Sequence, residues 1–267
     1  MIRDITLGQY YPADSILHKL DPRVKLVTTI VFLIALFLND SLYGYLVATV
    51  FLAAVIRLSR VPFRFIVRGL KTIFLILLIT LVFNLFLTPG DQVLVQIWKL
   101  KITDQGLRTA VFMAIRLVYL IIGSSIMTLT TTPNDLTDGL ERLLNPLKKL
   151  RVPVHEVAMM MSIALRFIPI LLEETDKIMK AQTARGADFE QGNLIQRAKN
   201  LVPLLVPLFI SAFRRANDLA MAMEARCYRG GSGRTKMKPL AYERRDYCAY
   251  GVVALFLGLT IAVRVIL

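Results

Sequence analysis

The chain has 267 residues, of which 55% are hydrophobic, and 33 Lys and Arg stand against 19 Asp and Glu for a formal net charge of +14. Ordinary soluble domains are about 45–50% apolar even when Gly is counted, so this composition argues against a soluble protein and predicts a membrane protein. The basic residues form no dense run with interleaved aromatics, so no nucleic-acid partner is expected. Two cysteines cannot build a disulfide framework, which is consistent with a reducing, cytoplasm-facing setting.

Five apolar runs are long enough, or nearly long enough, to cross a bilayer, which takes about 20 mostly apolar residues. They cover residues 24–38, 42–56, 72–88, 107–130 and 247–267. The first two are short and are separated only by Asn39-Asp40-Ser41, so we expect a helical hairpin there. Pro89-Gly90-Asp91 predicts a turn after the third run. We expect residues 91–106, which contain the only tryptophan, Trp98, to lie at the membrane interface.

The charge of the loops predicts the orientation. With the N-terminus inside, the 57–71 loop with its five Lys and Arg is also inside, while the 39–41 turn with none is outside, as the positive-inside rule requires. We therefore expect a multi-pass protein of the cell membrane with a cytoplasmic N-terminus. Residues 1–21 contain no signal-peptide core. Residues 1–130 are predicted to form an N-terminal transmembrane part with four spans, and residues 246–267 a C-terminal transmembrane helix.

The segment 131–245 is too long for a simple loop and too amphipathic for disorder, and it holds 19 of the 33 Lys and Arg. We expect it to be a cytoplasmic domain of one short and two long helices. The short helix should begin with Asn134 or Asp135 as its N-cap and reach about Leu150, with an interruption at Asn145-Pro146. The predicted fold class is therefore an all-α membrane protein with about five transmembrane helices and three cytoplasmic-side helices.

The two long helices of this segment share one design. The first should run from after Pro153 to Ala184 or Arg185, the second from about Asn193 to Arg226, and each passes from an apolar half to a polar half. We expect Pro169, Pro203 and Pro207 to kink them.

Both long helices also end in the same dipeptide, Ala-Arg. The ends read Thr183-Ala184-Arg185-Gly186 and Glu224-Ala225-Arg226-Cys227. For one helix, the favourable interaction of Arg with the negative end of the helix dipole is a sufficient explanation. The repetition favours another one: a small Ala lets the helix end approach a second surface, where Arg offers a planar fork of five donors. Spacing alone leaves both explanations open.

Several motifs, taken in order, resemble the transmembrane coupling subunits of energy-coupling factor transporters, the EcfT family. They are Gly8-Gln9-Tyr10-Tyr11-Pro12, Ser15, the stretch His18-Lys19-Leu20-Asp21-Pro22-Arg23-Val24-Lys25-Leu26, Leu165-Arg166-Phe167-Ile168-Pro169, and the two Ala-Arg ends. The resemblance implies a non-catalytic subunit that transmits ATP hydrolysis in two cytoplasmic ABC-type ATPases to a small substrate-binding membrane subunit, for uptake of a vitamin or another micronutrient. A cobalt- or nickel-dedicated subunit of the same family is the alternative.

The resemblance also implies a docking role for both ends of the long helices, which it makes coupling helices. The ATPase-docking residues would be Ala184, Arg185, Gly186, Ala225, Arg226 and Cys227. Cys227 departs from the Gly that follows the first motif, so a left-handed cap is less expected there, and Gly230-Gly231 could supply that turn instead.

A membrane enzyme and a stand-alone transporter are the less favoured classes. The segment from Gly230 to Thr235 lacks the Lys of a phosphate-binding loop, and no His/Cys cluster has metal-ligand spacing. The acidic cluster at residues 173–176 lies on the polar half of a helix, where such clusters are usually solvated. We expect no catalytic residue, metal or cofactor. Arg116 and Arg166 lie in apolar stretches, and internal structural pairing is favoured over ion transport for both.

Overall fold

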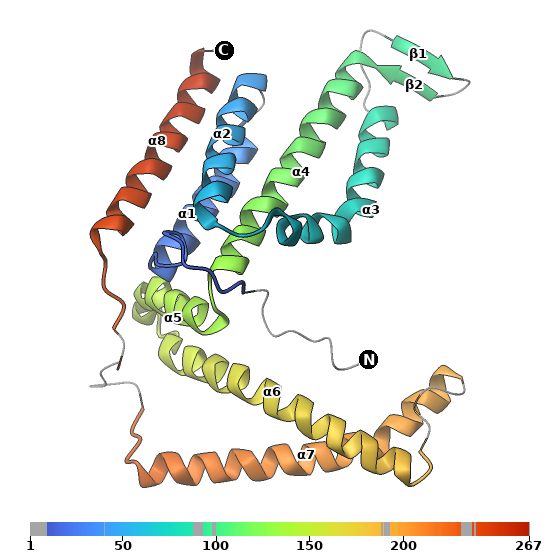
Figure 1. The fold of residues 1–267 in the computed structure, drawn as a ribbon, viewed down its shortest axis with the longest axis vertical. Helices are drawn as coiled ribbons and strands as arrows, with labels where there is room; N and C mark the ends of the chain where they lie inside the picture. The colour runs from blue at the N-terminus through green and yellow to red at the C-terminus, as the bar shows by residue number, and fades with distance from the viewer. Residues whose placement is uncertain are drawn as a thin grey trace. The chain divides into compact units, whose positions relative to one another are not determined.

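The computed structural model (Figure 1) divides the chain into two compact units. We call residues 8–139 and 240–267 the bundle unit, and residues 1–7 and 140–239 the two-helix unit. The structure describes residues 10–39, 41–87, 93–97, 100–187, 189, 193–230, 237 and 239–266. Gly8 and Gln9 of the N-terminal motif, the Pro89-Gly90-Asp91 turn, Trp98 and the Gly231–Thr235 stretch lie outside the described residues.

The bundle unit is built from five long helices. These are α1 (Pro22–Leu38), α2 (Leu42–Ser59), α3 (Phe63–Leu87), α4 (Asp104–Thr130) and α8 (Arg244–Ile266). Figure 1 shows α1, α2 and α8 side by side, with α1 packing against α4 and α8 and with α3 running along α4. The start of the short helix α5 (Pro133–Leu144) also belongs to this unit.

Side chains of short polar residues fix the starts of the bundle helices. Asp21 accepts a hydrogen bond from the backbone N–H of Arg23 at the start of α1, Ser41 does the same for α2, and Thr103 for α4. Each satisfies a backbone donor that has no partner inside the helix. The predicted hairpin of α1 and α2 follows from the Ser41 cap, which starts the second helix after a short turn.

The basic segment 57–71, expected to be a loop, is mostly helical. α3 begins at Phe63, and its first part, Phe63–Lys71, is bent by 59° from Ile73–Phe86. The expectation counted the basic residues and overlooked the apolar spacing of Phe63, Ile66, Val67 and Leu70, which is that of an amphipathic helix. Ile66 is fully buried, which shows the face that the first part of α3 turns inward.

A short antiparallel hairpin connects α3 to α4, where an interfacial segment was expected. It consists of β1 (Val93–Ile97) and β2 (Leu100–Thr103). The alternation of Val93, Val95 and Ile97 has the period of two that favours a strand. All the other regular elements of the described chain are helices, so the all-α class is confirmed with this one addition.

The two-helix unit contains η2 (Asn145–Leu150), α6 (Val154–Ala184) and α7 (Leu194–Ala225). The interruption at Asn145-Pro146 and the bounds of both long helices agree with the sequence predictions.

The predicted cap of α5 was wrong, because Thr132 occupies the N-cap position. The Thr132 hydroxyl accepts a hydrogen bond from the Asp135 N–H and donates one to the Asp135 carboxylate. The Thr132 hydroxyl thus satisfies one of the backbone donors that the start of α5 leaves without a partner inside the helix.

Four helices of the described chain, α2, α4, α6 and α8, are long and apolar enough to cross a membrane, and α3 makes a fifth if its two parts form one span. The number of candidate spans agrees with the predicted number, but the helices that qualify are not all the predicted ones. α1 has 17 residues, at the lower end of the spanning range of about 17–25, whereas α6 qualifies by its apolar first half.

The core of the bundle lies where α1, α2, α4 and α8 meet. Phe32, Leu36, Leu52, Ile126 and Phe256 are among its buried members. Phe51 stacks on Phe256 with ring centroids 4.4 Å apart, and Phe32 lies against both rings. This aromatic cluster joins the first hairpin to the C-terminal helix.

Candidate docking site: two matched helix ends

α6 and α7 pack against each other as antiparallel helices. The Gln182 side chain donates to the backbone carbonyl of Pro203, 3.4 Å away, and the Glu174 carboxylate accepts from the Ser211 hydroxyl. The Arg215 guanidinium donates to the second Glu174 oxygen at 2.6 Å. These contacts form the polar side of the crossing, which we call the Glu174 clasp.

An apolar cavity of about 330 Å³ continues the crossing between the two helices. Its lining comes from α6 (Ile163, Phe167, Leu171) and from α7 (Ala212, Arg215, Ala216, Leu219, Ala220, Met223). The alanines of α7 have no bulk beyond Cβ, so the two helices can approach each other closely here. Ala212, Ala216 and Ala220 of α7 therefore face α6.

α6 ends in a Schellman motif. Arg185 is the C-cap, and Gly186 has the left-handed φ of +88°. The N–H of Gly186 donates to the carbonyl of Thr183 and the N–H of Ala187 to that of Gln182, both at 3.0 Å. These two bonds satisfy carbonyl groups that the end of a helix leaves free.

α7 ends in the same motif, although no Gly is present. Arg226 is the C-cap, the N–H of Cys227 donates to the carbonyl of Glu224 at 2.8 Å, and the N–H of Tyr228 donates to that of Met223 at 3.0 Å. Cys227 has a φ of +55°. The expectation that a left-handed cap is less favoured at Cys227 was wrong, because the two closing hydrogen bonds offset the steric cost of this conformation for a residue with a Cβ.

Arg185 and Arg226 are exposed, as are Ala184 and Ala225. Among the described residues, neither guanidinium has a hydrogen bond or an ion pair to another side chain. At 1.5 Å per residue, Arg185 lies about 16 Å along α6 from Glu174, and Arg226 lies about 22 Å along α7 from Ser211. Because the helices are antiparallel, these two arginines, which we call the Arg tips, lie on opposite sides of the Glu174 clasp.

The two arginines predicted to be paired within the membrane differ. Arg116 of α4 donates from Nε to the Tyr45 hydroxyl at 3.1 Å and from Nη2 to the Asn39 carbonyl at 2.8 Å, and both of these partners belong to the first hairpin. Arg166 of α6 is exposed and makes no ion pair to Glu156, Glu173 or any other described residue.

Lys25 belongs to the N-terminal motif, but no local signal in the sequence gave it a role. It is 7% exposed, and its ammonium donates to the carbonyl of Thr130 at 2.7 Å and to that of His18 at 3.1 Å. Thr130 is the last residue of α4, and Asn39, which receives Arg116, is the C-cap of α1. The antiparallel helices α1 and α4 therefore each hold a cation against the C-terminal end of the other, where the helix dipole is negative.

Asp21 and Asp246 join the starts of α1 and α8. The N–H of Asp21 donates to one oxygen of Asp246 at 2.9 Å, and the N–H of Glu243 donates to the other at 2.8 Å. The Asp21 carboxylate forms a two-pronged pair with Arg23, whose guanidinium lies 4.0 Å from the centre of the Tyr242 ring. The Asp21-Pro22-Arg23 motif thus has a structural role, because it joins the start of α1 to the start of α8 and so closes the bundle.

His18 completes the N-terminal loop of the bundle unit. Its Nε2 lies 2.9 Å from the Tyr11 carbonyl, which can only accept, so Nε2 carries the proton and Nδ1 accepts from the Ser15 hydroxyl at 2.6 Å. Burial lowers the pKa of His18 below its usual 6.5, and the nearby Lys25 charge acts in the same direction. The folded chain therefore favours the neutral ring more than water does.

No group of three or more His, Cys, Asp or Glu side chains that could hold a metal ion occurs among the residues that the structure describes. The Arg tips, the Glu174 clasp and the contacts at the helix ends of the bundle unit are built from polar side chains and backbone carbonyls. Such groups are suited to holding helices and protein surfaces together by hydrogen bonds.

Comparison with known proteins gives consistent matches over almost the whole chain. The family model described as cobalt transport protein (CbiQ) matches residues 13–237. A relative from Clostridium kluyveri is 60% identical over 93% of this chain and 93% of its own length, and one from Ruminiclostridium cellulolyticum is 54% identical over 96% of both. A relative from Bacillus subtilis is 50% identical over 92% of this chain and 93% of its own. All three are named energy-coupling factor transporter transmembrane protein EcfT.

Proposed function

Because this chain belongs to the family of energy-coupling factor transporter transmembrane proteins, we propose that it couples ATP hydrolysis in two cytoplasmic ABC-type ATPases to a small substrate-binding membrane subunit. The chain itself supplies no catalytic group in this proposal. Its work is to carry movement between the ATPases and the substrate-binding subunit.

The observation that carries this proposal is that the two helix ends share one C-terminal motif. Arg185 and Arg226 are both C-caps, both follow an exposed Ala, and both are held by a Schellman motif, in one case at the steric cost of a left-handed Cys227. A helix end that only had to stop would not need the same exposed side chain twice. Two equivalent tips suit two equivalent sockets, one on each ATPase, where Arg can bind carboxylates or carbonyls with its planar fork.

The Glu174 clasp gives the tips a mechanical connection. It fixes where α6 and α7 cross, so a change in the distance between the two ATPases would turn the helices against each other about this point. The apolar half of α7 is the surface available to respond, because it leaves large side chains exposed. They are Leu201, Val202, Leu205, Val206, Phe209, Ile210 and Phe213. We propose that this surface contacts the substrate-binding membrane subunit and the bilayer, since exposed apolar patches of this kind mark interaction sites.

We propose uptake of a vitamin or another micronutrient as the process served, with the cargo selected by the substrate-binding subunit. A cobalt- or nickel-dedicated transporter is the second candidate, favoured by the description of the matching family model. The two differ in the partner that co-purifies with the chain and not in any side chain described above.

The decisive experiment is a double substitution, Arg185→Ala with Arg226→Ala, in the full chain co-expressed with its ATPases and substrate-binding subunit. An interfacial Arg hot spot contributes about 2 kcal/mol or more, so each lost tip should weaken ATPase binding by at least about 30-fold. ATP-driven uptake in proteoliposomes should disappear while insertion of the chain is unchanged. Arg214→Ala, an exposed arginine of α7 away from the tip, is the matched control. Normal uptake by the double variant would overturn the docking role.

A further inference from the structure

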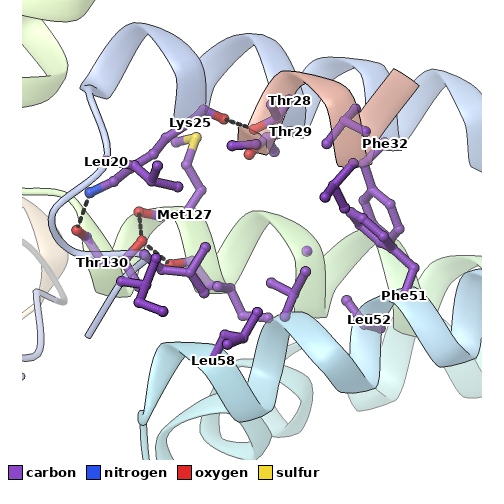
Figure 2. A pocket seen from close by; sticks show the side chains of 18 of the residues that line it. Leu20, Lys25, Thr28, Thr29, Phe32, Phe51, Leu52, Leu58, Met127 and Thr130 are labelled. Carbon is purple, nitrogen blue, oxygen red and sulfur yellow. Dashed lines mark hydrogen bonds between the residues drawn. The ribbon is translucent and has the colours of Figure 1, made fainter. Parts of the chain in front are cut away.

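The bundle unit contains a cavity that the coupling function does not use. It has a volume of about 380 Å³ and lies among α1, α2, α4 and α8. In Figure 2 the Lys25 ammonium and Thr130 lie at one end of it, and Phe32, Phe51 and Leu52 lie at the other. Residues of α8, including Arg245, Cys248 and Val252, complete the wall.

The position of this cavity along the helices is well defined. It is lined by the first turns of α1 and α8 and by the last turns of α2 and α4. The positive-inside pattern predicts that these ends face the cytoplasm. The cavity is thus expected at the depth of the inner leaflet, with its aromatic end toward the middle of the bilayer.

The chemistry of the lining selects an elongated apolar occupant. Most of the wall is made of aliphatic and aromatic side chains, such as Leu20, Val55 and Ile126. A methylene group is about as large as a water molecule, whose share of liquid volume is about 30 Å³, so 380 Å³ accommodates roughly a dozen methylene groups. This is the greater part of one fatty acyl chain.

Arg245 supplies the polar end of the site. Its Nη2 pairs with Glu243 at 2.7 Å, while its Nε is buried without a hydrogen-bond partner among the described residues. A buried donor without a partner is unfavourable. The Arg245 side chain as a whole is 36% exposed and lines the cavity, so a phosphate at the cavity mouth would meet the exposed part of the guanidinium and take a charge-assisted hydrogen bond from it, which is stronger than a neutral one.

We propose that this cavity is a binding site for one anionic phospholipid of the inner leaflet, with an acyl chain between α1, α2, α4 and α8 and the phosphate at Arg245. The acyl chain gains little by leaving the equally apolar bilayer, so selection rests on the head group and on Arg245. The cytoplasmic leaflet is rich in such lipids and carries a negative surface potential. The bound lipid would fill the space between α8 and the first hairpin and so stiffen the bundle that carries the coupling helices.

The test uses the full chain in nanodiscs of phosphatidylcholine and phosphatidylglycerol, from which retained lipids are counted by native mass spectrometry. The wild-type chain should keep one phosphatidylglycerol, and Arg245→Gln should lower its retention relative to phosphatidylcholine by about tenfold, the loss of one charge-assisted contact. Arg244→Gln is the matched control, because Arg244 does not line the cavity. Equal retention of the two lipids by the wild-type chain, or equal retention by the two variants, would overturn the proposal.

A second measurement does not depend on altering the lining. Cys227 and Cys248 are the only cysteines, and Cys248 lines the cavity, so Cys227→Ala leaves one reporter thiol at the site. Its modification by N-ethylmaleimide should slow about tenfold when phosphatidylglycerol is present at about ten times its dissociation constant. A rate that is the same in nanodiscs with and without phosphatidylglycerol would show that the cavity does not hold this lipid.

Discussion

The left-handed Cys227 permits a sharp test of how the docking tips are built, by exchanging the residues at the two helix ends. In Cys227→Gly the side chain is lost where φ is +55°, and in Gly186→Cys one is added where φ is +88°. No heavy atom lies within 4 Å of a Cβ placed on Gly186. The second substitution therefore meets no clash, and its effect comes from the backbone alone.

The magnitude follows from two opposing costs. A residue with a Cβ loses about 1–2 kcal/mol in the left-handed conformation, while Gly loses about 0.5–1 kcal/mol more conformational entropy than Ala when it is ordered. Cys227→Gly should thus stabilise the end of α7 by about 0.5–1 kcal/mol, and Gly186→Cys should destabilise the end of α6 by a similar amount.

Hydrogen exchange reports on both ends through the closing hydrogen bonds. The amide of Tyr228, bonded to Met223, should exchange about two- to fivefold more slowly in Cys227→Gly, and the amide of Ala187, bonded to Gln182, about two- to fivefold faster in Gly186→Cys. Each unaltered end serves as the control for the other. Unchanged exchange at Tyr228 would refute the steric cost that we assign to the α7 end.

Further predictions concern the bundle unit and the clasp. Lys25→Met should lower the free energy of unfolding by about 2–4 kcal/mol, because the buried carbonyl of Thr130 and the partly buried carbonyl of His18 lose their donor; an unchanged melting temperature would contradict this. The folded chain favours the neutral form of His18, so this residue contributes fully to stability above pH about 6.5. That contribution is lost as the pH falls through the lowered pKa of His18 in the folded chain. Acidification should therefore lower the melting temperature of the wild-type chain more than that of His18→Gln, and equal shifts would argue against it. A double-mutant cycle of Glu174→Gln and Arg215→Gln should give a coupling energy of about 1 kcal/mol, and a value near zero would exclude the clasp.

Much of the architecture could be predicted from hydrophobic run length and punctuation. The bounds of α6 and α7, the break at Asn145-Pro146 and the hairpin at residues 39–41 follow from local signals that tertiary structure did not override. The start of α3 was missed because five basic residues suggested a loop, although apolar residues at helical spacing were interleaved with them. The hairpin β1–β2 was missed because its strands are only four and five residues long.

The cap at Cys227 shows the limit of reasoning from residue type. Intrinsic preference argues against a left-handed Cys, and only the pair of closing hydrogen bonds, which depends on the backbone path after Arg226, reverses that preference. Lys25 and Asp246 posed a different difficulty. Their partners are distant in sequence, and no local pattern in a single sequence links a lysine in one helix to the last carbonyl of another.

The distant partners in the bundle unit impose an order on its assembly during synthesis. The acceptor of Lys25 at Thr130 is 105 residues downstream, and the carboxylate that receives the Asp21 amide is 225 residues downstream. At about 5–20 residues per second, the ribosome delivers the second of these many seconds after the first hairpin has formed. The N-terminal loop therefore lacks both partners until the last helix is made, so a chain that stops before Asp246 would have its first hairpin formed and its bundle still open.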